Sequence, residues 1–376
     1  MTPPNTIPAS FQPPASSLSS RLFIFIMAGG SGERFWPASR KTTPKHLLRL
    51  LSEETLLEQT VRRFQGMVPL EQIFILTNEA QWEATCRALP KHPTENIISE
   101  PTKRDTAPAA TLATALALRQ NPNAIVGLFP ADAMIHEEIL FREQVLESAA
   151  LAAESDALIT FSIEPSHPSI SFGYLELGKI LPHRSTEKTI FRSVDSFVEK
   201  PPLEKAKEFL ASGYHGWNAG MFLWQATTFL EECCRQQPLL ATFAQELLES
   251  NSPSKFILEK FEHLPKISVD YAIMEHAKQV IAAIATFDWD DVGHWTALPQ
   301  HLGTDAAGNT IKSGSQGIVM HDSMNNIVIS QDTPEKTIAL CGVENLVVVQ
   351  TQDALLICHR DAVEKIKQLP LPDELR

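Results

Sequence analysis

Residues 22–47 constrain the fold of this chain more than any other stretch. Residues 22–28 form an apolar and aromatic run with the length and side chains of a buried β-strand. The run stops at Gly29, Gly30, Ser31 and Gly32, a composition that favours a tight, open backbone loop. Four cationic side chains follow the loop closely: Arg34, Arg40, Lys41 and Lys45. A strand that ends in a glycine loop with cations behind it predicts a site for a polyphosphate.

Strand-like and helix-like segments alternate from this loop to residue 161. The predicted strands are 73–76, 96–99, 124–129 and 157–161, and the predicted helices are 53–65, 80–89, 106–119 and 137–153. Asp105 or Thr106 is the expected N-cap of the third helix. This alternation predicts an α/β fold with a mostly parallel sheet covered on both faces. Ligands of such sheets bind at the carboxyl ends of the strands, where both Gly29 and Asp132 are expected.

The pattern changes twice further along the chain. Strand-like segments at 172–177, 190–198, 219–224 and 281–287 are mixed with helical stretches between 226 and 277. Beyond residue 302, six short strand-like segments recur between turn residues at 310–312, 317–320, 326–329, 337–340, 346–349 and 355–358, and a helix follows at 361–368. No short repeat is evident there. We therefore expect a disordered leader at 1–20, a catalytic domain at 21–302 and a small β-rich domain at 303–376.

Composition restricts the partners and the compartment. The chain has 376 residues, of which 43% are hydrophobic and 20% charged, as in ordinary globular proteins. A net charge of −13 argues against nucleic acid or an anionic membrane as the main partner, although local cations can still hold a small anion. Five cysteines without C-x-x-C spacing predict reduced thiols and a cytoplasmic location. The Pro- and Ser-rich start lacks the features of a secretory signal, and no apolar run approaches the ~18 residues of a membrane span.

The glycine loop matches neither of the two commonest phosphate-binding motifs. It lacks the Lys-Ser/Thr ending of a P-loop, and Phe35 stands where a dinucleotide fingerprint needs its third glycine. One interpretation is a plain turn between a strand and a helix. The other is a cradle of backbone N–H groups, with Arg34 as a charged clamp and Lys45 as a point charge on the α-phosphate.

Seven segments spread over roughly residues 22–298 carry a resemblance to a known family. They are AGGSGERFWPASRKTTPKHLL (28–48), EPTKRDTAP (100–108), PAD (130–132), FVEKP (197–201), WNAGMF (217–222), SVDYAIME (268–275) and WDDVGHW (289–295). In this order they resemble the signatures of the sugar-nucleotide pyrophosphorylases, and among these the mannose-1-phosphate guanylyltransferases.

The resemblance implies a Rossmann-like nucleotidyltransferase domain followed by a β-helix-like C-terminal domain. It also implies that GMP passes from GTP to mannose 1-phosphate, which yields GDP-mannose and pyrophosphate. The residues then expected to bind the nucleotide are Ala28, Gly29, Gly30, Ser31, Gly32, Glu33, Arg34, Lys45, Glu100, Asp105, Thr106 and Asp132. Those expected to bind the sugar phosphate are Gly173, Glu199, Lys200 and Asn218.

The chemistry of this reaction agrees with the residue types present. A sugar phosphate has its second pKa near ~6, so its oxygen is already a nucleophile at neutral pH and no protein base is needed. The protein contributes positioning and neutralisation of charge. Mg²⁺ prefers one or two carboxylates plus phosphate oxygens, which makes Asp132 and Asp291 the candidate metal ligands. Arg34 and Lys45 complete the expected catalytic set.

Each candidate also has a simpler interpretation. Asp132 is equally suited to capping a helix, and Asp291 to a turn. Glu199 and Lys200 are equally an ordinary surface ion pair, and Asp270 and Tyr271 are equally residues that start a helix.

The chain departs from the family pattern at four positions: His46 replaces glutamine, Asp105 asparagine, Ala133 histidine and His294 serine. Because Arg34, Lys45 and both aspartates are intact, we expect activity. Many bacterial relatives carry an additional isomerase domain, for which no room is expected before Arg376. The rival hypotheses are a pyrophosphorylase for another base or sugar, and a catalytically silent regulatory homologue. The β-rich tail is the candidate contact for a homodimer.

Overall fold

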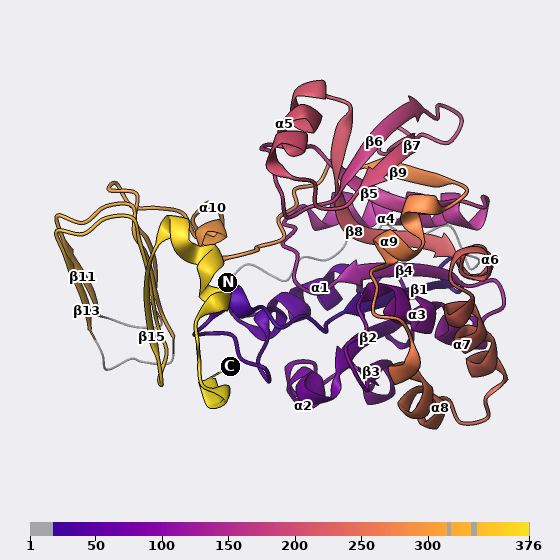
Figure 1. Cartoon of the computed structure of the whole chain (residues 1–376), viewed down its shortest axis with the longest axis horizontal. Coiled ribbons are helices and arrows are strands. Elements are labelled where there is room, and N and C mark those ends of the chain that lie inside the picture. Colours follow the sequence, from indigo (N-terminus) through magenta and orange to yellow (C-terminus); the bar gives the residue numbers. More distant parts are fainter. Residues whose placement is uncertain (1–17, 314–316, 332–336, 376) are drawn as a thin grey trace.

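The computed structural model describes residues 18–313, 317–331 and 337–375. A large α/β part, which contains one nine-stranded sheet, is joined to a smaller β-rich region that projects to its side (Figure 1). Residues 1–17 of the predicted leader lie outside the described residues. Within the described ranges, no helix is long and apolar enough to cross a membrane.

The large sheet has the order β3-β2-β1-β4-β8-β5-β9-β7-β6. Pairing is parallel from β3 to β4 and between β5 and β9. The other pairings, each of which involves β6, β7 or β8, are antiparallel. The strands are β1 (Leu22–Met27), β2 (Ile73–Asn78), β3 (Ile97–Glu100), β4 (Ile125–Pro130), β5 (Leu158–Ile163), β6 (Tyr174–Ile180), β7 (Ile190–Val198), β8 (His215–Gln225) and β9 (Val280–Ile284).

Helices cover both faces of this sheet. They are α1 (Leu56–Phe64), α2 (Glu79–Ala88), α3 (Thr106–Gln120), α4 (Glu138–Ala153), α5 (Leu203–Ser212), α6 (Ala226–Gln236), α7 (Pro238–Glu249), α8 (Pro253–Lys260), α9 (Val269–Ala272) and α10 (Leu298–Leu302). Three 3-10 helices matter for the site: η1 (Glu33–Phe35), η2 (Lys45–Leu47) and η8 (Arg360–Gln368).

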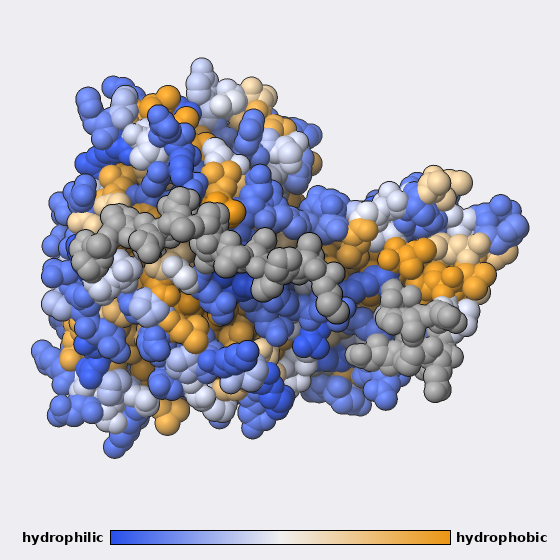
Figure 2. All heavy atoms as spheres, turned by 180° about the vertical axis from the view of Figure 1, so that it is seen from behind, coloured by the Kyte–Doolittle hydropathy of each residue, from blue (hydrophilic) through white to orange (hydrophobic). Residues whose placement is uncertain are grey.

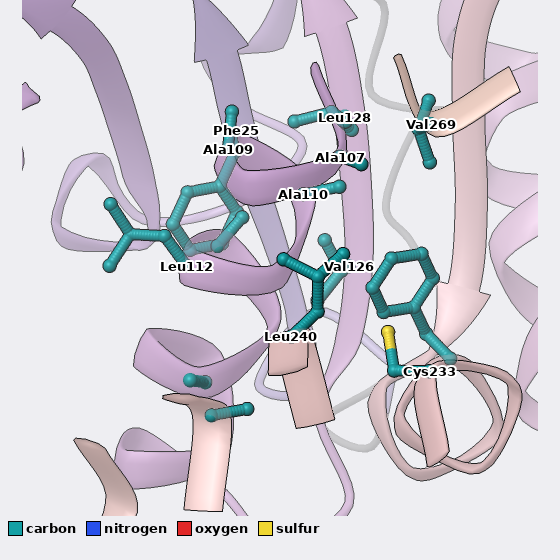
Figure 3. Close-up of a cluster of buried hydrophobic side chains, with 14 of the residues drawn as sticks. Phe25, Ala107, Ala109, Ala110, Leu112, Val126, Leu128, Cys233, Leu240 and Val269 are labelled. Carbon is teal, nitrogen blue, oxygen red and sulfur yellow. The ribbon is translucent and has the colours of Figure 1, made fainter. Parts of the chain in front are cut away.

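The alternation of side chains along β1 explains why both faces are apolar. Phe25 points into a cluster with the alanine-rich helix α3 and with α6, α7 and α9 (Figure 3). Ile24 and Ile26 point to the opposite face, where they meet side chains from α1 and α4. Successive strand residues face opposite sides, so a continuous apolar run is buried twice.

The predicted α/β architecture with a mixed, partly parallel sheet is confirmed, and most elements lie within a few residues of the prediction. Helix α5 was not predicted, although Leu203, Ala206 and Phe209 recur at helical spacing; of this helix only Ala206 and Phe209 are buried. Strand β8 begins earlier than predicted, at His215, and lies between β4 and β5 in the middle of the sheet.

The β-rich region has the coiled, β-helix-like form that the resemblance implied. Parallel strands stack in two sheets, β10-β12-β14 and β11-β13, and β15 closes the first sheet antiparallel. The strands are β10 (Thr310–Ser313), β11 (Ile318–His321), β12 (Ile327–Ser330), β13 (Ile338–Cys341), β14 (Leu346–Gln350) and β15 (Leu355–His359). The predicted final helix is present as η8.

Equivalent corners of successive coils use residues that tolerate a left-handed backbone. Gly308, Asn325 and Asn345 precede the stacked strands, with φ of 77°, 54° and 57°. Asn309 and Asn326 form a ladder inside the coil, in which Asn326 Nδ2 donates to Asn309 Oδ1 at 3.1 Å. The coils differ in length, which hid this repeat in the sequence.

Candidate active site

The glycine loop connects β1 to η1 at the carboxyl edge of the sheet. Ala28 is fixed to β2, because its N–H donates to the Leu76 carbonyl at 2.7 Å and its carbonyl accepts from Thr77 Oγ1 at 3.0 Å. A Cβ atom at Gly29 or Gly30 would meet nothing within 4 Å. Packing therefore does not require glycine at these two positions, and the bare backbone leaves room for a ligand to approach closely.

Gly32 has a different role. Its φ is +65°, and a Cβ atom there would lie 2.4 Å from Lys45 Cβ. Ser39 Oγ donates to the Gly32 carbonyl at 2.8 Å. Gly32 is therefore required by packing, and the loop and Lys45 are held against each other, which explains why the two motifs occur together.

Lys45 connects the two aspartates expected to hold a metal. The side chain is buried, and its Nζ lies 2.7 Å from Asp132 Oδ2. The same ammonium group donates to the Asp291 carbonyl at 2.5 Å. Residues far apart in the sequence thus meet around one buried positive charge.

The loops that carry the two aspartates are bonded to each other. Met134 and Asp290 exchange backbone hydrogen bonds of 2.8 and 3.1 Å. From α1, Arg63 Nη2 donates to the Ala133 carbonyl at 2.7 Å, and Thr60 Oγ1 donates to the Ala131 carbonyl at 3.2 Å. The carbonyl groups of both neighbours of Asp132 are therefore fixed by side chains that sequence reasoning missed, since neither Thr60 nor Arg63 belongs to a recognisable motif.

The carboxylates suit a hard divalent cation. Burial, together with the charges of Asp290 and Asp132, raises the pKa of Asp291 to about 6 against the opposing charge of Lys45. A site where carboxylates repel each other favours a bound cation. Within the described residues, no group of three or more His, Cys, Asp or Glu could hold a metal. Asp132 and Asp291 offer two carboxylates, which fits an ion that completes its ligands with phosphate oxygens.

Three of the four residues predicted to bind the sugar phosphate share a cavity with both aspartates, and the fourth, Lys200, does not line it. This cavity of about 190 Å³ is lined by Asp132, Asp291, Gly173, Glu199 and Asn218, among others. A Cβ atom at Gly173 would lie 2.4 Å from Glu199 Oε2, so glycine leaves space for that carboxylate. Lys200 pairs with Glu199 at 2.9 Å; burial alone would lower its pKa, but the bond to Glu199 outweighs it and the pKa is raised.

Asp270 also lines this cavity and forms part of its polar floor. Its Oδ1 accepts from Asn218 Nδ2 at 2.9 Å, and Asn218 Oδ1 accepts from Thr160 Oγ1 at 2.8 Å. Burial and, second to it, the charge of Glu199 raise the pKa of Asp270 to about 7. Asp270 therefore contacts the asparagine predicted to bind the sugar, in addition to its place at the start of α9.

Three residues predicted to bind the nucleotide, Glu100, Asp105 and Thr106, lie between the end of β3 and the start of α3. Glu100 is buried, and burial raises its pKa to about 8, against the opposing charge of Lys103. Asp105 has a φ of +69° and caps α3 through Thr106 N–H, and Thr106 Oγ1 accepts from Val269 N–H at 2.8 Å. Asp105 and Thr106 thus have structural partners, whereas Glu100 is a buried acceptor two strands from the glycine loop.

Two further residues frame the nucleotide side. Gln81 of α2 is buried and donates through Nε2 to the Gly30 carbonyl at 3.3 Å, a contact that no sequence motif announced. Arg34 lines a second cavity of about 490 Å³ together with Asp291 and His294. Ser31 and Glu33 contact each other at 3.4 Å on the exposed side of the loop.

Comparison with known proteins identifies the class. The family model for nucleotidyl transferases matches residues 24–306, and the model for the MannoseP isomerase/GMP-like beta-helix domain matches residues 317–369. The first match covers the glycine loop, Lys45 and both aspartates. The chain is thus an enzyme of the nucleotidyltransferase class, a class that uses a divalent metal ion.

Individual relatives show to which family of nucleotidyltransferases the chain belongs. A mannose-1-phosphate guanylyltransferase from Escherichia coli K12 is 36% identical over 93% of this chain and 73% of its own length, and ManC of Salmonella typhimurium is 35% identical over 93% and 72%. The chain belongs to the mannose-1-phosphate guanylyltransferase family. A solved structure described as a mannose-1-phosphate geranyltransferase from Thermus thermophilus superposes with a TM-score of 0.80, at 30% identity, over 93% of this chain and 98% of that one.

The departures from the family pattern leave this framework intact. His46 is buried, and burial lowers its pKa to about 4, so the ring is neutral at pH 7. At position 133 Arg63 binds the backbone carbonyl, so this contact does not depend on which side chain stands there. His294 bonds to Thr296 Oγ1 through Nδ1 at 2.5 Å and lines the larger cavity.

Proposed function

We propose that this chain transfers GMP from GTP to α-D-mannose 1-phosphate and releases GDP-mannose and pyrophosphate. The observation that carries the proposal is the single cavity that joins Glu199, Asn218 and Gly173 to Asp132 and Asp291, with Lys45 between the two loops. A sugar site and a phosphoryl-transfer site that share their walls suit a reaction between a sugar phosphate and a nucleotide. The names of the relatives from Escherichia coli and Salmonella typhimurium support the choice of mannose and guanine.

We propose that the metal ion is Mg²⁺ and that Asp132 and Asp291 hold it. When bound, Mg²⁺ supplies neutralisation of the charge on the triphosphate and on the phosphoryl group in transfer. The fit is supported by the paired carboxylates and by the raised pKa of Asp291.

The protein side chains orient the two substrates for an in-line displacement. A sugar-phosphate oxygen forms a bond to the α-phosphorus of GTP, and the bond from that phosphorus to the pyrophosphate oxygen breaks. Because the sugar phosphate is largely a dianion at neutral pH, no proton has to move to a side chain. Lys45 neutralises charge at the reacting phosphorus, and Arg34 and the open N–H groups of the glycine loop hold the leaving phosphates.

On the sugar side, buried acceptors match the hydroxyl donors of the ring. Glu199 and Asn218 bind hydroxyl groups, and Lys200 binds the sugar phosphate. On the base side, Glu100 accepts from the N–H groups of guanine. Asp105 and Thr106 hold the start of α3 near Glu100, where they support the base pocket.

A panel of nucleoside triphosphates against sugar 1-phosphates tests this proposal. We expect pyrophosphate release with GTP, mannose 1-phosphate and Mg²⁺ that exceeds every other combination by at least roughly tenfold in kcat/KM. A higher rate with another base or sugar would favour a different pyrophosphorylase. No release with any pair, combined with tight binding of a nucleotide sugar, would favour the regulatory homologue and overturn the proposal.

We further infer that the β-rich region mediates a homodimer. Edge strand β15 exposes Leu355 and Ile357 by 53% and 60%, and Ile311 on the opposite edge is 44% exposed. Apolar atoms gather on this projecting region (Figure 2). We expect a mass of twice 41.7 kDa in solution and dissociation by Ile357→Lys, with Tyr214→Lys as an exposed control on the α/β part. A monomeric wild-type chain would contradict this inference.

A further inference from the structure

The C-terminal region packs directly on the segment that carries the phosphate-binding residues. Val363 and Ile366 of η8 are buried in one apolar cluster with Phe35 and Trp36, next to the glycine loop. Trp36 Nε1 donates to the Leu375 carbonyl at 2.9 Å. The end of the chain thus forms a wall behind the loop instead of a separate unit.

Three ion pairs also join the segment after the glycine loop to the C-terminal region, and we call this contact the seam. Arg34 Nε lies 2.8 Å from Glu364 Oε2, Arg40 Nη2 lies 3.0 Å from Asp353 Oδ1, and Lys41 Nζ lies 3.5 Å from Asp373 Oδ1. Of the four cations that follow the glycine loop, three are therefore paired with acids of the C-terminal region. The fourth, Lys45, is paired with Asp132 inside the active site.

The contact between Arg34 and Glu364 differs from the other two in its position. Both side chains line the cavity of about 490 Å³ that Asp291 and His294 also line. Asp353 and Asp373 do not line this cavity, and their contacts hold the seam from outside. Glu364 is thus the C-terminal acid that reaches into the site.

The geometry of this contact suits orientation of the guanidinium. Glu364 meets Arg34 on its Nε side as an ion pair, while Arg34 Nε has no aligned hydrogen-bond partner among the described residues. A guanidinium with a carboxylate on its Nε side keeps its outer pair of N–H groups free for a bidentate bond to a phosphate. Glu364 is 48% exposed, so water screens its repulsion of an incoming triphosphate, whereas its short contact with Arg34 persists.

We propose that Glu364 is a positioning residue for Arg34, so that the C-terminal region completes the triphosphate site. The proposal rests on the proposed function, which makes Arg34 a ligand of the nucleotide phosphates. An arginine has many rotamers, and a carboxylate that selects one of them before the ligand arrives removes part of the entropy cost of binding.

The test compares Glu364→Ala with Asp353→Ala, which removes a neighbouring contact of the same seam. We expect Glu364→Ala to lower kcat/KM for GTP roughly 10-fold or more, with the KM for mannose 1-phosphate and the melting temperature unchanged. Glu364→Gln should recover part of the loss, because it keeps the shape of the side chain and an oxygen beside Nε. Asp353→Ala should leave both kcat/KM for GTP and the KM for mannose 1-phosphate unchanged.

A double-mutant cycle separates positioning from a general structural effect. In an Arg34→Lys background, which lacks the forked guanidinium, Glu364→Ala should cause little further loss. Unchanged or increased kcat/KM for GTP in Glu364→Ala would overturn the proposal, and an increase would mean that Glu364 competes with the triphosphate. Equal losses for both substrates with a lowered melting temperature would also overturn it.

The wild-type chain in the same assay distinguishes this proposal from the function itself. If wild-type turnover needs another base or sugar, the proposed function fails, and the variants are then compared on that substrate pair. Because Glu364 acts through Arg34, which binds phosphates and not the base, the expected loss in the triphosphate kcat/KM is the same for any base.

Discussion

The phosphate side and the sugar side of the site are built in opposite ways. On the phosphate side, bare glycine backbone lies open, and cations are held by carboxylates, as Lys45 is by Asp132 and Arg34 by Glu364. On the sugar side, Glu199, Asn218 and Asp270 form a largely buried set of acceptors. A polyanion needs donors and positive charge that stay oriented beside water, whereas neutral hydroxyl groups are recognised best by acceptors away from it.

The largest expected effect comes from Asp132, which lies where the phosphate side and the sugar side meet. Asp132→Asn removes a charge that contacts Lys45 and is assigned to the metal, so we expect kcat to fall roughly 10³-fold under saturating Mg²⁺. The exposed Asp195→Asn on β7 serves as the control and should retain wild-type rate. Full activity in Asp132→Asn would show that the two sides are not joined through this carboxylate.

Two glycine substitutions separate packing from ligand access on the phosphate side. Gly30→Ala meets open space, so the melting temperature should be unchanged while the KM for GTP rises roughly 30-fold, the equivalent of about 2 kcal/mol. Gly32→Ala has a φ of +65° and collides with Lys45, so it should lower the melting temperature by several degrees. Thermal melts and GTP kinetics of both variants test this, and equal loss of stability in the two would contradict it.

On the sugar side, Asp270 tests whether the buried acceptors act as a set. Asp270→Asn weakens the polar floor under Asn218, and we expect the KM for mannose 1-phosphate to rise roughly tenfold while the KM for GTP changes little. Initial rates at varied concentrations of each substrate measure this. A rise in the KM for GTP alone would place Asp270 outside the sugar site.

The smallest effect concerns pH on the base side. The Glu100 carboxyl, with its pKa raised to about 8 by burial, is mostly protonated at pH 7 and mostly charged at pH 9. Guanine N–H groups prefer the charged form, so the KM for GTP should fall about fivefold from pH 7 to pH 9. Glu100→Gln cannot titrate there and should show a flatter profile; an identical profile in both proteins would contradict the assignment.

Only some of the residues on each side of the site could be predicted from the sequence. The glycine loop and Asp132 follow the ends of β1 and β4, where parallel sheets bind ligands, and Lys45 and Asp291 lie in continuous sequence motifs. Glu364, Arg63 and Gln81 carry no local signal, because each acts through one contact with a residue distant in the sequence. The corners of the β-rich region were hidden by coils of unequal length, although Asn309 and Asn326 repeat there.

The position of β8 in the sheet also could not be predicted from the sequence. Its apolar run predicted a strand, but periodicity could not place it antiparallel between β4 and β5. That placement brings Asn218 into the cavity with Asp132. The sugar side therefore depends on long-range strand pairing, which periodicity does not predict.

The most direct test of a two-substrate site is the stoichiometry of its products. With GTP, mannose 1-phosphate and Mg²⁺, phosphorus NMR should show GDP-mannose and pyrophosphate appearing in equal amounts. Omission of mannose 1-phosphate should abolish the release of pyrophosphate. Pyrophosphate formed together with free GMP, at a rate independent of mannose 1-phosphate, would contradict the account.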